Sequence, residues 1–279
     1  ICQTPEYYPS RNEAALLQEH ATRIIEYCQP EHLIELGSGS SRKTRFLLDA
    51  CAEQGQHCVY WPFDVAEEML NASAAELVAD YPWLTVRGLL GDYNGGLAQL
   101  PLPEQGRRLF AFLGGTIGNF EPDAAQAMLA EIRSMMRPGD FLLLGADRVK
   151  DEHILEAAYD DAQGHTARFN LNVLNVLNRE LDADFPVDNF SHRAWFNAED
   201  SRIEMRLRAT SDHRVRFGKL NAEIEIAAGE EILTEVSRKF TDESLSQTLK
   251  DAGLALHEHL EAPDAAYSLV IAGVIKPVL

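Results

Sequence analysis

Short apolar runs alternate with longer amphipathic stretches along the first part of the chain, and this alternation restricts the folds open to it. The apolar runs have the length of buried strands, and the stretches between them have helical spacing. The expected strands are residues 32–36, 58–62, 84–90, 109–113 and 141–144. The expected helices are residues 42–53, 66–79 and 124–136. Strands separated by helices predict βαβ units and a parallel sheet covered on both faces.

The alternation stops after residue 147, where a separate module is expected. Two helical stretches come first, at residues 151–160 and 165–182. Apolar side chains then alternate with charged ones, the period of an antiparallel strand with one buried face. The apolar members of this alternation are Ile203, Met205 and Leu207, with similar patterns at Ile224, Ile226 and residues 232–237. Residues 148–239 are therefore expected to form an inserted α+β domain that binds the substrate.

From residue 241 the first pattern returns. Thr241 and Ser244 have the spacing of a capped helix start, and Gly253 is expected to end that helix. Two apolar runs follow, at residues 254–259 and 267–274, and the polar turn between them predicts a terminal antiparallel hairpin. Residues 1–147 and 240–279 should thus make one Rossmann-like, doubly wound α/β core.

The first expected strand leads into the glycine turn ELGSGS at residues 35–40. Such a turn lets a ligand approach bare backbone at the start of the next helix. Arg42 stands where a P-loop needs its glycine before Lys43, and where the GxGxxG fingerprint needs its third glycine. An acidic residue ahead of Gly37 and Gly39 suits a cofactor with a cationic amino-acid tail and no phosphates, such as S-adenosylmethionine. A structural turn without a ligand is the plain alternative.

Acidic residues also follow the next two expected strands. Asp64 closes the second, where a carboxylate can accept both hydroxyls of a ribose. Asp92 and Tyr93 follow the third, where a carboxylate can take an adenine amino group and the ring can pack on the base. Each acid alone is more simply a solvated loop residue or a helix cap. Together, at the carboxyl ends of consecutive strands, they indicate a nucleoside-type ligand.

The fourth expected strand ends in the glycine-rich segment at residues 114–120. Its glycines bring backbone close to a neighbour, and Asn119 is placed where a substrate would meet the cofactor. A tight loop with Asn119 in a left-handed conformation is the alternative.

Four motifs resemble the histidine Nα-methyltransferases of the ergothioneine pathway. They are EYYP at residues 6–9, ELGSGSSRK at 35–43, FLGGTIGNF at 112–120 and TEVS at 234–237. Similar matches are AYDD at residues 158–161, FNLNVL at 169–174 and IEMRL at 203–207. The resemblance covers essentially the whole chain. It implies a class I methyltransferase fold, S-adenosylmethionine as cofactor with S-adenosylhomocysteine as product, no metal, and trimethylation of free histidine to hercynine.

The resemblance also assigns roles by matching positions. The cofactor-binding residues that it implies are Gly37, Gly39, Lys43, Asp64, Asp92 and Tyr93. Asn119 and Tyr159 would hold the substrate carboxylate, and Tyr7 would lie near the amino group, so that Tyr7 and Asn119 are nearest the reaction. The residues implied around the imidazole are Glu235 and Ser237, which would bond its two nitrogens, and Met205, which would pack on the ring.

The imidazole assignment has a chemical basis. An imidazole has two polar edges, and a buried site must satisfy both. An acidic acceptor and a hydroxyl two residues apart on a strand project to the same face. By spacing alone, Glu235 would be a surface residue paired with Arg238 or Lys239.

Two features depart from the family. Its members carry a further N-terminal segment with a tyrosine that closes over the pocket, and this chain lacks it, so we expect a lid that is incomplete or supplied by other residues. The third-strand loop reads DYNGG at residues 92–96, where relatives often have histidine, which predicts slightly different packing of the adenine.

Composition excludes other classes of function. A net charge of −19 argues against a nucleic-acid partner, and the apolar runs are too short to cross a membrane. The four cysteines are scattered, without metal-ligand spacing, and no leader opens the sequence, so we expect reduced thiols in a cytoplasmic monomer. The alternatives are a sibling methyltransferase acting on another amino acid such as tryptophan, a non-catalytic S-adenosylmethionine-binding protein and, less favoured, a nicotinamide oxidoreductase.

Overall fold

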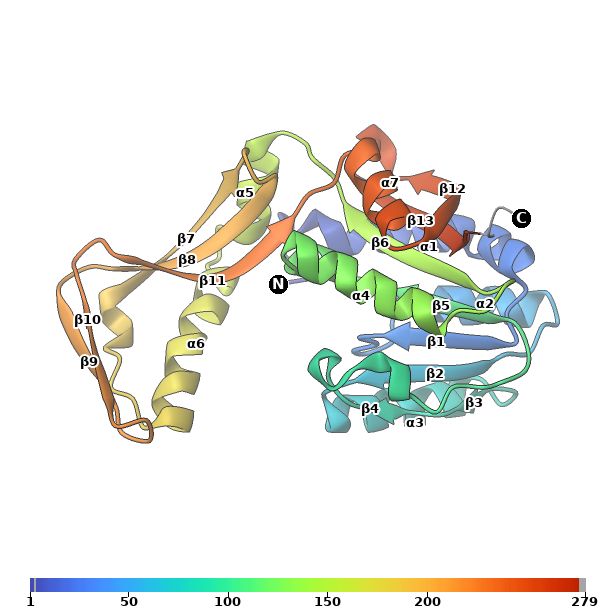
Figure 1. The fold of residues 1–279 in the computed structure, drawn as a ribbon, viewed down its shortest axis with the longest axis horizontal. Coiled ribbons are helices and arrows are strands. Elements are labelled where there is room, and N and C mark those ends of the chain that lie inside the picture. The colour runs from blue at the N-terminus through green and yellow to red at the C-terminus, as the bar shows by residue number, and fades with distance from the viewer. Residues whose placement is uncertain (3, 276–279) are drawn as a thin grey trace. The chain divides into compact units, whose positions relative to one another are not determined.

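The computed structural model describes residues 1–2 and 4–275, which form two compact units (Figure 1). The core unit comprises Pro9–Arg148 and the described residues from Phe240 onward. The insert unit comprises Val149–Lys239 and the described residues up to Tyr8. The described residues up to Tyr8, which were expected in the core, thus group with the insert unit, because Tyr7 and Tyr8 pack in an apolar cluster of that unit.

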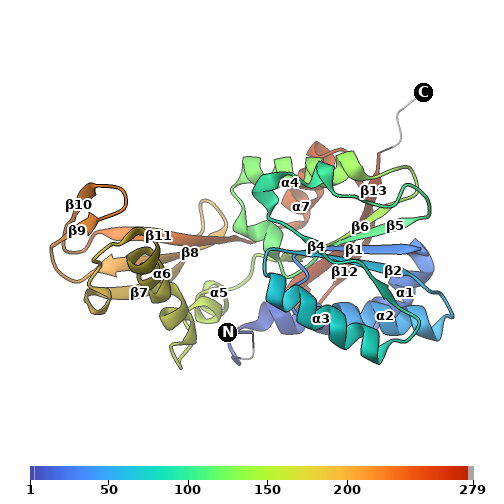
Figure 2. The same cartoon turned by 90° about the horizontal axis from the view of Figure 1, so that it is seen from below.

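The core unit is built on an eight-stranded, mostly parallel sheet (Figures 1 and 2). Its strands are β1 (His32–Leu36), β2 (Val59–Asp64), β3 (Thr85–Val86), β4 (Leu89–Leu90), β5 (Arg108–Phe112), β6 (Phe141–Asp147), β12 (Leu254–Glu261) and β13 (Tyr267–Val274). Their spatial order is β12-β13-β6-β5-β1-β2-β3, with β4 also paired to β2. The pairs β12–β13 and β13–β6 are antiparallel, and the other pairs of this sheet are parallel. The doubly wound sheet and its terminal hairpin are as expected from the sequence.

Helices cover both faces of this sheet, as Figure 2 shows. The core helices are α1 (Tyr8–Cys28), α2 (Thr44–Glu53), α3 (Glu67–Asp80), α4 (Pro122–Met135) and α7 (Asp242–Asp251). Side chains alternate along β1: Leu33 packs with α1, α2 and α3, whereas Ile34 and Leu36 pack with α4 and α7. Helix α1 was not anticipated, although its apolar residues recur at helical spacing. None of the described helices is long and apolar enough to span a bilayer.

Two strands differ from their sequence-based bounds in ways that affect the site. Strand β2 continues to Asp64, so this carboxylate is the last residue of the strand. The third expected strand is broken into β3 and β4, which both pair with β2. A Cβ at Gly88, in the break, would lie 3.3 Å from the Leu70 side chain, so the chain passes close to α3 there.

The insert unit combines two helices with antiparallel strands. Its helices are α5 (Glu152–Tyr159) and α6 (His165–Leu181). Its strands are β7 (Phe190–Asn197), β8 (Arg202–Ala209), β9 (His213–Phe217), β10 (Ala222–Ile226) and β11 (Glu231–Arg238). Strands β11, β8 and β7 form one sheet in that order, and β9 and β10 form a hairpin. A short 3₁₀ helix in this unit is Val187–Asn189, and those of the core unit are Tyr93–Gly95, Leu97–Gln99, Thr116–Asn119 and Pro263–Ala265.

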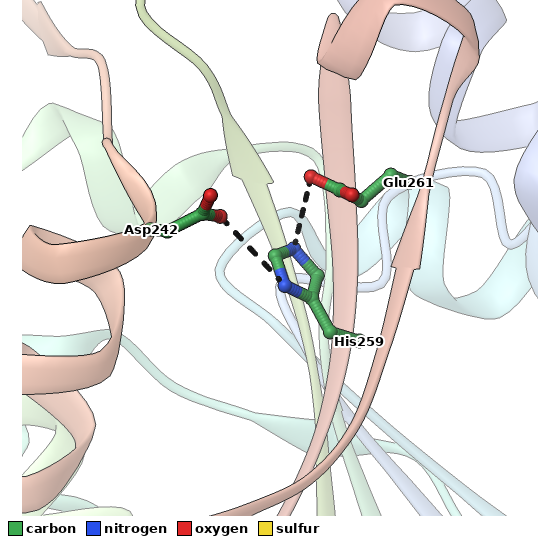
Figure 3. Close-up of side chains that lie close together, drawn as sticks. All are labelled: Asp242, His259 and Glu261. Atoms are coloured by element: carbon green, nitrogen blue, oxygen red, sulfur yellow. Dashed lines mark ion pairs between the residues drawn. The ribbon is translucent and has the colours of Figure 1, made fainter.

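Arg148 ties the core together where the chain leaves it and returns. Its buried guanidinium donates to the Phe240 carbonyl at 3.0 Å and to carboxylate oxygens of Asp242 and Glu261 at 2.7 and 2.9 Å. Asp242, His259 and Glu261 lie together with potential ligand atoms within 4.8 Å of one another (Figure 3). Because Arg148 already pairs with both carboxylates, we interpret the cluster as a structural ion-pair network.

Candidate active site

The glycine turn after β1 is tied to the end of β2. Gly37 and Gly39 have positive φ angles of 74° and 50°. The Gly37 N–H donates to the Phe63 carbonyl at 2.8 Å, and the Gly39 N–H donates to Asp64 Oδ2 at 2.7 Å. The turn therefore depends on backbone conformations that favour glycine, and the Asp64 carboxylate holds it. Asp64 Oδ1 also accepts the Ala66 N–H, at 2.9 Å.

A pocket of about 200 Å³ opens at these strand ends. Its lining residues are Gly37, Phe63, Asp64, Val65, Gly91, Asp92 and Tyr93. Four of the six cofactor residues expected from the sequence thus line one pocket, namely Gly37, Asp64, Asp92 and Tyr93. Gly39 stands beside it through its bond to Asp64, and Lys43 precedes α2.

Tyr93 forms one wall of this pocket. Its ring lies 5.8 Å from the Phe63 ring and 6.0 Å from the Phe112 ring, measured between centroids. A Cβ at Gly37 would come within 2.5 Å of the Tyr93 hydroxyl, so the turn and the ring fit only because residue 37 is glycine. The hydroxyls of Tyr93 and Ser38 are buried and find no hydrogen-bond partner among the described residues. Buried orphan hydroxyls beside an acid-lined pocket fit a ligand rich in hydroxyl and ring nitrogen groups, as a nucleoside is.

Glu35, the acidic residue of the turn, does not line the pocket. It is 3% exposed, and its carboxylate accepts hydrogen bonds from the hydroxyls of Thr44 and Tyr60. The suggestion that this acid suits a cationic cofactor tail is therefore replaced by a structural role beneath the turn. Burial raises the pKa of the Glu35 carboxyl to about 7, despite these hydrogen bonds.

We predict that Glu35→Gln stabilises the protein increasingly as the pH rises. A raised carboxyl pKa means that only the unfolded chain releases the proton between the ordinary value of 4.5 and about 7, so wild-type stability falls across this window. The amide has no proton to lose. Thermal unfolding of both proteins at about pH 5 and about pH 8 should show the advantage of the variant growing with pH. A difference independent of pH would contradict the shifted pKa.

Lys43 is paired with a residue that the sequence analysis did not identify. Its ammonium forms an ion pair with Glu13 of α1, whose carboxylate is fully buried. The Gly114 N–H donates to both oxygens of Glu13, at 2.8 and 2.9 Å, and the Tyr267 hydroxyl donates to one of them at 2.8 Å. Gly114 opens the loop after β5, so Glu13 joins two loops at the carboxyl edge of the sheet.

Asn119 ends the short 3₁₀ helix of the loop after β5. It is exposed and does not have a positive φ, whereas Gly114 and Gly115 do, at 80° and 65°. The left-handed residues of this loop are therefore glycines, and the alternative of a left-handed Asn119 is wrong. Asn119 belongs to the core unit.

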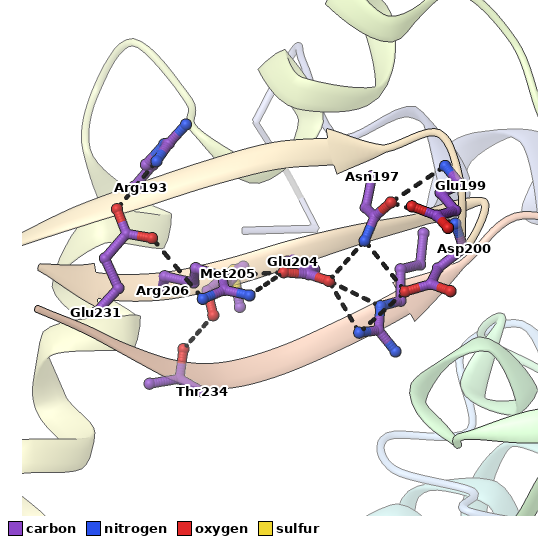
Figure 4. Close-up of polar contacts among 10 residues, drawn as sticks. Arg193, Asn197, Glu199, Asp200, Glu204, Met205, Arg206, Glu231 and Thr234 are labelled. Carbon is purple, nitrogen blue, oxygen red and sulfur yellow. Dashed lines mark hydrogen bonds and ion pairs between the residues drawn. The ribbon is translucent and has the colours of Figure 1, made fainter.

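The other expected substrate residues all belong to the insert unit, where a β-bulge sets the direction of Glu235. In the pairing of β11 with β8, Leu233 is opposite Arg206, but Glu235 is opposite Met205. The register shift falls at Thr234, whose hydroxyl donates to the Met205 carbonyl at 2.9 Å (Figure 4). Without the extra residue, Glu235 would be opposite Glu204 on the other face. The bulge therefore puts Glu235 on the same face as Met205, and a bulge next to a functional site commonly re-aims a side chain in this way.

The opposite face of β8 is an ion-pair network. Glu204 is 1% exposed and is paired with Arg202 and Arg206, while Asn197 donates to it at 3.1 Å (Figure 4). Burial opposes ionisation of Glu204, but hydrogen bonds from Arg206, Asn197 and Arg202 lower the pKa of this carboxyl to about 2. The two faces of the strand thus differ: one is polar and closed by its own pairs, and the other carries Met205.

Ser237 and Tyr159 meet at a second unanticipated residue, Lys239. The two hydroxyls lie 2.7 Å apart, and the Lys239 ammonium donates to each at 2.9 Å. Lys239 is 3% exposed, and its nitrogen lies 4.6 Å from the centre of the Tyr159 ring. The Tyr7 ring packs edge-on against Tyr159, with centroids 5.8 Å apart. The insert unit therefore brings Tyr7, Tyr159, Met205 and Ser237 to one region.

Glu235 lies close enough to this group to sense its charge. Burial raises the pKa of the Glu235 carboxyl, and the Lys239 ammonium opposes that shift. Glu235 is therefore a half-buried acid that shares a face of β11 with Ser237, and an acid and a hydroxyl on one face can satisfy both polar edges of a small heterocycle.

Comparisons with known proteins show which proteins this chain is similar to. A family model described as histidine-specific, SAM-dependent methyltransferase matches residues 1–274. The histidine N-alpha-methyltransferase of Mycobacterium tuberculosis is 47% identical over 254 residues, which cover 91% of this chain and 78% of that protein. The corresponding protein of Mycolicibacterium smegmatis is 44% identical over 272 residues, covering 98% and 84%. An S-adenosylmethionine-dependent methyltransferase structure from Clostridium acetobutylicum matches the fold with a TM-score of 0.52 at 11% identity, covering 93% of this chain and 91% of that one.

Proposed function

Because the chain belongs to the family of histidine-specific, S-adenosylmethionine-dependent methyltransferases, we propose that it methylates the α-amino nitrogen of free histidine three times, giving hercynine. The family model and the mycobacterial relatives confirm the resemblance that the motifs indicated, and the chain is an enzyme of this class. The observation that carries the choice of substrate is the bulge at Thr234, which turns Glu235 to the face of Met205.

The pocket at the ends of β1 and β2 is the proposed cofactor site. Asp64 would bind the ribose hydroxyls, Asp92 the adenine amino group, and Tyr93 would pack on the base. Lys43 would face the carboxylate of the cofactor's amino-acid tail, beside Gly37 and Gly39. The cofactor supplies an electrophilic methyl group on a sulfonium, so the chemistry at the protein side is mainly positioning, which is worth roughly 7–11 kcal/mol for well-oriented reactants.

The insert unit supplies the proposed contacts to histidine. Glu235 and Ser237 would bond the two imidazole nitrogens, Met205 would pack on the ring, and Tyr159 would contact the carboxylate. An α-amine has an ordinary pKa of about 8, so a proton must leave before each transfer. Tyr7, which packs on Tyr159, is the proposed neighbour of that nitrogen, and a water would take the proton, either directly or through the Tyr7 hydroxyl.

The same contacts disfavour tryptophan as the substrate. An indole has one N–H donor and no acceptor, so it could not bond both Glu235 and Ser237. We further propose that the enzyme acts as a cytoplasmic monomer without a metal ion. Four free cysteines, three of them buried, fit a reducing compartment.

The proposal is tested by incubating the purified protein with S-adenosylmethionine and each of the twenty amino acids, followed by mass spectrometry. We expect one, two and three added methyl groups on histidine alone, and fragmentation should place all of them on the α-nitrogen. Methylation of another amino acid, or of the imidazole ring, would overturn the substrate assignment while leaving the cofactor site. Binding of the cofactor without any transfer would favour the non-catalytic alternative.

A further inference from the structure

Glu13 is a charged residue with no exposure to solvent, in the core helix α1. Moving a carboxylate into the protein interior costs several kcal/mol unless donors compensate it. An apolar residue at this place in α1 would avoid that cost, as Leu16 and Leu17 do on the next turn. The buried acid therefore calls for an explanation through its partners.

The partners of Glu13 come from three separate parts of the core. They are the Gly114 N–H after β5, the Tyr267 hydroxyl at the start of β13 and the Lys43 ammonium before α2. Together they make four contacts to the two oxygens, about as many as a carboxylate has lone-pair positions. Glu13 is thus saturated and held in one orientation.

The space for this carboxylate is provided by a glycine within β6. A Cβ at Gly145 would lie 2.0 Å from Glu13 Oε1 and 2.8 Å from the Tyr267 hydroxyl oxygen. Gly145 does not have a positive φ, so the reason for glycine here is room for the carboxylate. Gly145 of β6 therefore leaves the space in which the Glu13 carboxylate of α1 meets the Tyr267 hydroxyl.

Lys43 is a partner of Glu13 whose side chain reaches solvent. Its side chain is 26% exposed, whereas that of Glu13 is 0% exposed. An ammonium has three N–H donors, and a single carboxylate contact leaves others for a ligand. Glu13 thus anchors Lys43 from below and fixes the Gly114 backbone at the same time.

We propose that Glu13 is a positioning residue for cofactor binding, which acts by holding the Lys43 ammonium in one geometry. The inference rests on the proposed role of Lys43 toward the carboxylate of the S-adenosylmethionine tail. Glu13 itself does not touch the cofactor. Its effect should therefore depend on Lys43 being present.

The test is a double-mutant cycle read by calorimetric titration with S-adenosylmethionine. We expect Glu13→Gln and Lys43→Met each to weaken binding about tenfold, because each removes one charge-assisted contact. The double variant should bind about as weakly as Lys43→Met alone, because Glu13 acts through Lys43. Additive losses would overturn the proposal.

Asp140→Asn is the matched control. Asp140 is also a buried carboxylate, paired with Arg108 in the core, but it precedes β6 at the opposite edge of the sheet. This variant should lower the melting temperature and leave the cofactor affinity unchanged. The same behaviour of Glu13→Gln, a lower melting temperature with wild-type affinity, would show a purely structural role and overturn the proposal.

Two outcomes separate this inference from the proposed function. Wild-type protein that binds no S-adenosylmethionine would overturn the function itself, and wild-type affinity in Lys43→Met would overturn the role of Lys43 and this inference with it. If Glu13→Gln does not fold, Tyr267→Phe replaces it in the cycle, because it removes one donor to Glu13 and retains the ring. We expect it to weaken cofactor binding severalfold, again only when Lys43 is present, and unchanged affinity would overturn the proposal.

Discussion

Asp64→Ala is expected to weaken binding of S-adenosylmethionine about a hundredfold, a loss of roughly 3 kcal/mol. The carboxylate has two functions at this position. It is the proposed acceptor for both ribose hydroxyls, and it already accepts the N–H groups of Gly39 and Ala66. Alanine would remove the ligand contacts and release the glycine turn together. Calorimetric titration with the cofactor measures the combined effect.

Two further variants divide this effect into its parts. Asp64→Asn retains the shape and one acceptor oxygen, so it should keep more of the turn and lose less affinity than alanine. Glu68→Ala removes an exposed acid from the first turn of the neighbouring helix α3 and should leave the affinity unchanged. If Asp64→Ala bound the cofactor as tightly as Glu68→Ala does, Asp64 would have no place in the site.

The core could be predicted because its strands are continuous, locally apolar segments. Strand β1 has the expected bounds, since both of its faces are buried and the run ends at a glycine. Strand β7 was not anticipated, because only Phe190 among its eight residues is buried. The strand is stabilised mainly by its pairing with β8. Non-local pairing of this kind leaves little trace in a single segment.

The cofactor pocket could be predicted from the topology of a parallel sheet, whereas the contacts of the buried acids Glu13 and Glu35 could not. Parallel strands present their carboxyl ends at one edge, so Gly37, Asp64 and Asp92 were expected together, and they line one pocket. Glu13 meets Gly114 across 101 residues and Tyr267 across 254 residues, a proximity that no local pattern encodes. Glu35 lies within the recognised motif, but the motif did not predict that its carboxylate would be buried against the hydroxyls of Thr44 and Tyr60.

The bulge in β11 also could not be predicted from the sequence. Simple alternation along TEVS predicts that Glu235 and Ser237 share a face, which the pairing with Met205 and Ile203 agrees with. Which face they share depends on the extra residue at Thr234, and that register is set by contacts with β8. The sequence alone therefore favoured a surface ion pair for Glu235, and only the register turns it toward the apolar side.

Glu235→Ala is expected to weaken histidine binding by about 1–3 kcal/mol, roughly ten- to a hundredfold in the dissociation constant. The variant removes the acceptor for one imidazole N–H, and a buried N–H cannot bond to water instead. The affinity for S-adenosylmethionine should stay at the wild-type value, because Glu235 belongs to the insert unit and the cofactor pocket to the core. Titration of histidine with the product S-adenosylhomocysteine present measures this step separately from catalysis.

Glu204→Gln supplies the control in the same sheet. Glu204 is also a glutamate and is more deeply buried, but it lies on the opposite face of the sheet, where it pairs with Arg202 and Arg206 (Figure 4). Removing its charge should lower the melting temperature through those pairs without changing the affinity for histidine. A loss of histidine binding in both variants would mean that disturbing the sheet is sufficient, and Glu235 would then need no direct contact with the imidazole. A loss confined to Glu235→Ala would place the imidazole on the Met205 face, because only that face is changed.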